Sequence, residues 1–217
     1  MPPVLEIVGV GAALTVYAFR WWFEPRRRAR RALAAAREVA LADVRNGDRP
    51  RVTGVAKARE RALTSPVGRR PCIGFQLIVE ERAPGDNDWR VALERSACTP
   101  FGLRDGSGEA LIEGPFLLGL DPDDRGDIWA NLPPSLFALL EEAGVPLTGM
   151  FGRDKAFRFR EALLQPGDRI TVLGRVFVEP EPSGQRDGFR APPMRCAFKG
   201  GPREPVVVSD ADHLEPP

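Results

Sequence analysis

Histidine is nearly missing from this sequence, and its few cysteines are far apart. The only histidine, His213, lies near the acidic, proline-ended C-terminus. A Ser-His-Asp triad, a multi-histidine metal centre or a histidine proton relay would each have to use that residue. Cys72, Cys98 and Cys196 form no C-x-x-C pair, so their spacing predicts neither a disulfide framework nor a zinc site. We therefore expect buried free thiols, no metal, no cofactor and no catalytic centre built on these residues.

The chain also lacks a broad excess of positive charge. Its net charge is +1, but residues 1–37 contain seven arginines against two glutamates, which leaves −4 for the remainder. Tyr17, the only tyrosine, belongs to the N-terminal apolar run. Nucleic-acid binding by an OB-like sheet needs basic groups and exposed aromatic side chains on one face. Nucleic acid is therefore not an expected partner.

The most apolar segment is the N-terminal run Val4–Phe23. As a helix, its 20 residues would be about 30 Å long, which matches the hydrocarbon core of a bilayer. Arg20, Trp21 and Trp22 stand at its end, where such side chains reach the membrane interface. The arginines that follow predict an outside N-terminus and a cytoplasmic body. We expect a single anchor in residues 1–24, in the inner membrane if the source is prokaryotic.

An arginine block follows this run and begins a second predicted helix, residues 25–46. Arg26, Arg27 and Arg28 lie at its start, and Leu33 is the first of several apolar residues at helical spacing. These arginines either contact anionic lipid headgroups or only set the topology. The alternative to a membrane anchor is a buried N-terminal helix of a soluble protein, because the uninterrupted apolar core has only 13 residues.

After the arginine helix the pattern changes to short runs rich in valine, isoleucine and phenylalanine. This predicts a mainly β domain over residues 47–209, followed by a flexible tail, 210–217. GDRPRVTG, which begins at Gly47, returns as GDRITVLG, which begins at Gly167. Each Gly-Asp pair predicts a tight turn, and the glycine that closes each copy predicts a bend or a close backbone approach. We expect two equivalent strands of a small OB-like β-barrel, with a repeated binding loop as the alternative.

Strand composition recurs along the body of the chain. The predicted strands are Arg51–Ala56, Cys72–Glu81, Trp89–Cys98, Phe101–Arg104, Ala110–Glu113, Phe157–Ala162, Arg169–Val178, Arg195–Phe198 and Pro205–Val208. An insertion of about residues 115–153 interrupts them, and Pro133–Gly144 within it predicts a short helix. The insertion contains Trp129, Leu132 and Phe137, which either pack onto the barrel or form a partner site.

Three carboxylate positions could serve a hydrolase that works without histidine: Asp105, Asp168 and the loop that begins at Asp121. DPDDRGD matches a calcium loop at positions 1, 3 and 6, but Arg125 and Leu132 occupy positions 5 and 12. Turns explain the other two aspartates. Because the spacing brings no acid and base together, an enzyme is the weaker alternative.

The order of four segments after a membrane helix is the most specific pattern in the chain: VTGVAKA, LTSPVGRRPCIGFQLIVEE, FGLRDGSGEALIE and EALLQPGDRITVLGRV. It resembles the GIDE domain, also called the beside-a-membrane (BAM) domain, of the MULAN/GIDE family of membrane-anchored E3 ubiquitin ligases. The resemblance covers about residues 47–210. In eukaryotic members it implies a second transmembrane helix and a C-terminal RING. Here no second apolar span follows, and three cysteines and one histidine cannot supply the eight ligands of a two-zinc RING.

The resemblance therefore implies a membrane-side recognition domain without ligase chemistry. We expect a single-pass membrane protein whose cytoplasmic β domain binds a protein or a small ligand near the bilayer. The alternatives are a carboxylate-dependent hydrolase and a component of a ubiquitin-ligase-like system whose ligase chemistry belongs to another chain.

Overall fold

The described part of the chain is mainly β, as predicted. The computed structural model describes residues 25–59, 62–82, 85, 87–122, 124–128, 132–149, 154–180 and 194–210. The predicted anchor, residues 1–24, and His213 lie outside them. None of the helices in the described ranges has the length and apolar character needed to cross a membrane.

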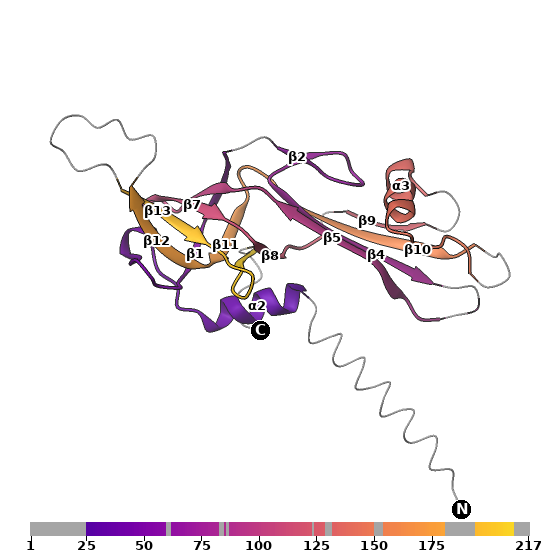
Figure 1. Ribbon diagram of the computed structural model, residues 1–217, viewed down its shortest axis with the longest axis horizontal. Helices are drawn as coiled ribbons and strands as arrows, with labels where there is room; N and C mark the ends of the chain where they lie inside the picture. Colours follow the sequence, from indigo (N-terminus) through magenta and orange to yellow (C-terminus); the bar gives the residue numbers. More distant parts are fainter. Residues whose placement is uncertain are drawn as a thin grey trace, which may run out of the picture.

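Most strands belong to a larger or a smaller sheet, which form the two halves of an elongated molecule (Figure 1), and a short two-stranded sheet is separate from both. In chain order they are α2 (Pro25–Ala35), η1 (Leu41–Asp43), β1 (Arg51–Ala58), β2 (Leu63–Thr64), β3 (Pro71–Cys72), β4 (Gly74–Arg82), β5 (Arg90–Cys98), β6 (Phe101–Arg104), β7 (Glu109–Glu113), β8 (Phe116–Gly119), β9 (Asp124–Ile128), α3 (Pro134–Glu142), β10 (Ala156–Leu164), β11 (Arg169–Leu173), β12 (Arg175–Pro180), β13 (Met194–Lys199) and β14 (Val206–Asp210). Each predicted strand and the predicted short helix has a counterpart among them, except that Arg169–Val178, predicted as one strand, is divided into β11 and β12.

The larger sheet is mixed and has the order β12-β13-β7-β6-β1-β11-β14-β8. Its pairing is cyclic, because β11 and β12 are consecutive and only Gly174 separates them. The path from β12 through β13, β7, β6 and β1 thus returns to the same chain segment. The main core cluster lies between these strands and includes Val52, Phe101, Val172 and Phe198, each with 0% of its surface exposed.

The repeated GD segments pair with each other, and this explains why they are alike. In the antiparallel register of β1 and β11, Val52 lies opposite Val172. Both turn glycines have positive φ, 89° at Gly47 and 100° at Gly167, as predicted for tight turns. The N–H of Gly47 donates to the carbonyl of Val176, which lies nine residues after Gly167. In the same way, the N–H of Gly167 donates to the carbonyl of Ala56, which lies nine residues after Gly47. The repeat is therefore a local two-fold arrangement of strands.

The smaller sheet has the order β5-β4-β10-β9 and carries α3 (Figure 1). Leu136 and Leu140, on the predicted apolar face of α3, are fully buried against Leu77, Val79 and Phe157 of the sheet. The helix begins after Pro133, and Gly144, with φ of 68°, follows its end. This second core is separate from the first.

The helix predicted over residues 25–46 is too long. α2 ends at Ala35, and the chain beyond it pairs with β1: the N–H of Arg51 donates to Arg37 O at 2.9 Å, and the N–H of Val39 donates to Arg51 O at 3.0 Å. Only η1 follows before β1. Backbone pairing with a strand has outweighed the helix propensity of an alanine-rich and arginine-rich segment.

The predicted insertion, 115–153, also has different limits. β8 lies inside that range but belongs to the larger sheet, where it pairs in parallel with β14. The DPDDRGD segment, predicted as a loop that begins at Asp121, includes part of β9, which pairs with β10. The inserted part is therefore the region that adds β9 and α3 to the smaller sheet.

Candidate functional site

α2 is fixed to the larger sheet by one face. Ala29 and Leu33 are fully buried and contact Leu173 and Val207, on β11 and β14. Both carboxylate oxygens of Asp121 accept hydrogen bonds from Arg30, at 3.2 Å each. The helix and the sheet therefore form one unit, and the direction in which α2 presents its other face is set.

The opposite face of α2 is basic and exposed. Of the predicted interface residues, Arg27 and Arg28 have exposed side chains, and Arg31 extends the same surface. The helix has no acidic residue, so nothing within it balances this charge. Arg20, Trp21 and Trp22 lie outside the described residues, as does the side chain of Arg26. The structure thus places a basic helical surface directly after the predicted anchor.

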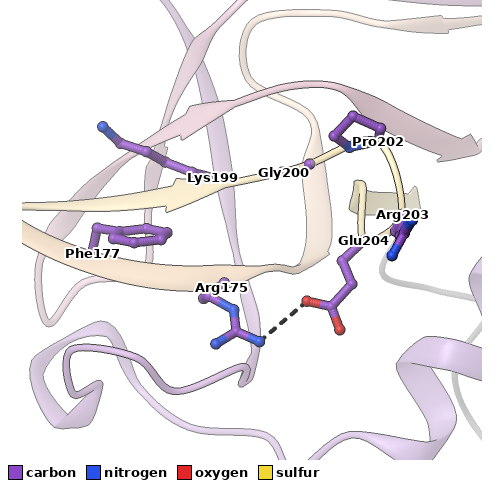
Figure 2. A pocket seen from close by; sticks show the side chains of 8 residues that line it. Arg175, Phe177, Lys199, Gly200, Pro202, Arg203 and Glu204 are labelled. Carbon is purple, nitrogen blue, oxygen red and sulfur yellow. Dashed lines mark hydrogen bonds and ion pairs between the residues drawn. The ribbon is translucent and has the colours of Figure 1, made fainter.

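A large hollow opens on the outer face of β12 and β13 (Figure 2). Its volume is about 780 Å³, and we call it the Phe177 hollow. It is lined by Arg175, Phe177, Lys199, Gly200, Gly201, Pro202, Arg203 and Glu204. Figure 2 shows Phe177 and Lys199 on neighbouring strands, with the turn Pro202–Glu204 at the other end. Phe177 belongs to β12, which stands at the end of the sheet order, and is 38% exposed.

Ion pairs hold the basic residues around Phe177. Glu179 accepts hydrogen bonds from Lys199 Nζ at 2.7 Å and from Arg195 Nε at 2.9 Å. Lys199 and Arg195 together hold the pKa of Glu179 below its usual range, and Glu179 in turn raises the pKa of Lys199. Arg175 donates to Glu204 at 3.2 Å. The hollow therefore has an aromatic floor and a rim of fixed charges.

The predicted partner residues of the insertion are not brought together in the described chain. Trp129 lies outside the described residues. Leu132 is partly buried and packs against the core under α3, whereas Phe137 is 42% exposed on α3. Leu132 thus has the packing role, and Phe137 keeps the partner role as a prediction.

The carboxylates proposed for a hydrolase bind backbone groups. Asp105 accepts hydrogen bonds from the N–H groups of Leu41, Ser107 and Gly108, at 2.7, 2.8 and 3.1 Å. Asp168 accepts one from Gln165 N at 2.6 Å. Within the described ranges, no group of three histidine, cysteine, aspartate or glutamate residues could hold a metal ion. Turn formation accounts for both aspartates.

The three cysteines are free thiols, as predicted, but only Cys72 is buried, and Cys98 and Cys196 are partly exposed. Cys72 is buried beside an apolar hollow of about 110 Å³, and burial raises its pKa. Burial, and then the charge of Cys72, raises the pKa of Cys98 to about 12. A thiol must lose its proton to act as a nucleophile, so these environments disfavour cysteine catalysis.

Comparisons with protein families, with curated proteins and with solved structures found no match to this chain. The functional argument therefore depends on the geometry of α2 and the hollows.

Proposed function

We propose that this chain is a single-pass membrane protein whose GIDE-like β module recognises a ligand or protein partner at the membrane surface, without catalysis of its own. The cyclic pairing of the larger sheet supports a small OB-like barrel for the module, because a sheet whose order returns to its first segment has closed on itself. The apolar run Val4–Phe23 supplies the anchor, and the module is cytoplasmic.

The observation that carries this proposal is the docking of α2. Buried Ala29 and Leu33 and the Arg30–Asp121 ion pair fix the helix, while Arg28 and Arg31 point outward. α2 begins one residue after the anchor, so no linker separates the module from the bilayer. Each arginine near an anionic surface contributes on the order of 1 kcal/mol. The helix therefore orients the module on the membrane.

The Phe177 hollow is the recognition surface in this proposal. Phe177 offers an apolar contact, and Arg203 is exposed with no hydrogen bond or ion pair to another described residue. A ligand that combines an apolar group with an acidic group fits this arrangement.

The anchor and the basic helix can be tested one after the other in the full-length protein. Val10→Arg/Leu14→Arg places two charges in the apolar run, and we expect alkaline carbonate to extract this variant but not the wild type from membranes. The variant should still sediment with phosphatidylglycerol vesicles. Adding Arg28→Glu/Arg31→Glu should weaken vesicle binding at least about thirtyfold, given two charges of about 1 kcal/mol each.

Arg59→Glu/Arg104→Glu is the matched control, because both side chains are exposed and neither residue belongs to β8, β11 or β14, the strands that α2 contacts. Equal loss of vesicle binding in both pairs of substitutions would refute the orienting role of α2. Wild type extracted by carbonate would refute the anchor.

Partner recognition is tested by replacing single exposed apolar side chains with alanine. Full-length protein and its Phe177→Ala, Phe137→Ala and Val91→Ala variants serve as baits in solubilised membranes of the source cell. We expect Phe177→Ala to lose the retained partner and Val91→Ala, whose parent side chain is 43% exposed, to keep it. Loss with Phe137→Ala alone would assign recognition to α3.

A further inference from the structure

A second hollow lies between the end of α2 and the start of β1. Its volume is about 580 Å³, within the range of small-molecule sites. It is lined by Arg37, Val39, Asp43, Arg45, Asp48, Arg49 and Pro50, and we call it the arginine hollow. The segment that forms it is hydrogen-bonded to β12, the strand that carries Phe177: the N–H of Gly47 donates to Val176 O at 2.8 Å.

The segment that forms the arginine hollow is held in place along its length. Arg37 and Val39 pair with Arg51, at the first strand. The N–H of Leu41 donates to Asp105 at 2.7 Å, and the N–H of Ala42 donates to Ser107 Oγ at 3.0 Å. Asn46 and Asp48 bind β12. The backbone is thus pre-organised, which lowers the entropic cost of binding.

The charged side chains of this hollow have no partners in the described chain. The side chains of Arg37, Arg45 and Arg49 are exposed, and none of these guanidinium groups makes a hydrogen bond or ion pair with another described residue. The carboxylates of Asp43 and Asp48 are also without such a partner among the described residues. Elsewhere in the same half, Arg30, Arg51 and Arg175 each pair with a carboxylate.

Three guanidinium groups and two carboxylates give the hollow a charge of +1 and both kinds of binding group. A planar guanidinium donates two parallel hydrogen bonds to phosphate oxygens. The carboxylates repel a bare inorganic anion, but they accept hydrogen bonds from hydroxyl groups. A phosphodiester with free hydroxyls has one negative charge and satisfies both sets.

We propose that the arginine hollow binds a phosphodiester headgroup that carries hydroxyl groups, such as phosphoglycerol. The arginines bind the phosphate, and Asp43 and Asp48 accept the hydroxyls. This inference rests on the proposed function, because the proposed anchor is what places the arginine hollow beside the membrane. It adds the chemistry of the headgroup that the hollow binds. The same chemistry is offered by a lipid in the bilayer and by a soluble phosphodiester.

The test uses the full chain in maltoside micelles, which contain no phosphate. The probes are phosphatidylglycerol, its deacylated form glycerophosphoglycerol, phosphatidylcholine, which is a phosphodiester without hydroxyl groups, and inorganic phosphate. Binding is followed by native mass spectrometry and calorimetry. We expect phosphoglycerol probes to bind best, and Arg45→Ala/Arg49→Ala to weaken them at least about tenfold.

Two further variants separate the roles. Arg59→Ala/Arg104→Ala removes equal charge elsewhere and should leave binding unchanged. Asp43→Asn/Asp48→Asn should reduce the preference for phosphoglycerol over inorganic phosphate. Unchanged thermal melting of each variant shows that the fold is kept.

Binding of the lipid alone assigns the site to a bilayer headgroup, and binding of both forms assigns it to the phosphodiester itself. The proposal is overturned if no probe binds, if inorganic phosphate binds best, or if Arg45→Ala/Arg49→Ala binds like the wild type. Vesicle sedimentation of the Arg28→Glu/Arg31→Glu variant reports the orienting role of α2 separately, so the two proposals fail independently.

Discussion

Glu161 orders a surface loop from a fully buried position. Its carboxylate accepts hydrogen bonds from Ser65 Oγ at 3.1 Å and from the N–H groups of Val67 and Gly68 at 2.7 and 2.9 Å. The loop joins β2 to β3, whereas Glu161 belongs to β10. One carboxylate thus holds the small hairpin to the smaller sheet.

Replacing Glu161 should show how much stability is lost when the hydrogen-bond donors of this loop lose their acceptor. In Glu161→Gln the amide can accept fewer of these hydrogen bonds, and its NH₂ group faces backbone donors. We expect a loss of about 1–3 kcal/mol in the free energy of unfolding, measured by urea titration of the full chain in micelles. Glu109→Gln, which removes an exposed carboxylate paired with Lys57, should change it by less than about 0.5 kcal/mol. Equal effects would contradict the role of the loop.

Asp105 gives the stability of the β6–β7 turn a pH dependence. Burial raises its pKa, but hydrogen bonds from Leu41, Ser107 and Gly108 outweigh burial, and the net pKa lies below its ordinary value. A carboxyl whose pKa is lowered by folding stabilises the fold above its unfolded pKa of about 3.9, and that contribution disappears as pH falls through the folded pKa.

Asp105→Asn should therefore lower the melting temperature at pH 7 and have a much smaller effect at pH 3. Melting curves at both pH values measure the difference. A deficit of the same size at both would show that the turn does not depend on the ionised carboxylate.

Single residues also show what sequence could not indicate about the site. Val176, Phe177 and Val178 are consecutive apolar residues, so alternation alone does not reveal which side chain faces outward. The structure buries Val176 and exposes Phe177 and Val178. The arginine hollow was equally hidden, because part of its lining, from Arg37 to Arg45, belongs to a segment predicted to be helical, and the rest belongs to the first GD repeat. The basic start of α2, by contrast, is visible in the sequence.

At the scale of elements, predictable strands had alternating apolar residues between turn signals. β1 and β11 are of this kind. β9, with the sequence DRGDI, has one apolar residue. It is a strand because its backbone pairs with β10 in antiparallel register. The division of the strands between two sheets depends on long-range pairing, which local periodicity does not encode.

Gly54 tests the close approach predicted for the first GD repeat. A β-carbon there would lie 2.6 Å from Arg104 O, a backbone atom of β6, so the strands would have to separate. We expect Gly54→Ala to reduce the free energy of unfolding by about 1–3 kcal/mol in urea titrations. Gly108→Ala, whose β-carbon would make an ordinary 3.5 Å contact with Leu41, is the control. Similar stability of the two variants would contradict the close packing of β1 against β6.

At the scale of the whole molecule, the two sheets have separate cores of different size. The cluster inside the larger sheet extends over all its central strands, whereas the cluster under α3 is centred on Leu77, Val79, Leu136, Leu140 and Phe157. The chain links the halves where it passes from β1 to β4, from β5 to β6, from β8 to β9 and from β10 to β11. Regions with less buried apolar surface open at lower free energy in native-state exchange.

Leu140→Ala should therefore act on one half only. It removes a fully buried side chain from the smaller core, and we expect a loss of about 2–5 kcal/mol in the stability of that half. Deuterium uptake should rise in α3, β9 and β10, while β1 and β11 keep their wild-type protection. A matched change, Leu103→Ala in the larger core, should raise uptake around β1 and β6 instead. If Leu140→Ala raised uptake equally in both sheets, the halves would unfold as one unit. Separate responses would mean that α3 and the smaller sheet can open while the Phe177 hollow and the arginine hollow stay formed, because no residue of the smaller sheet lines either hollow.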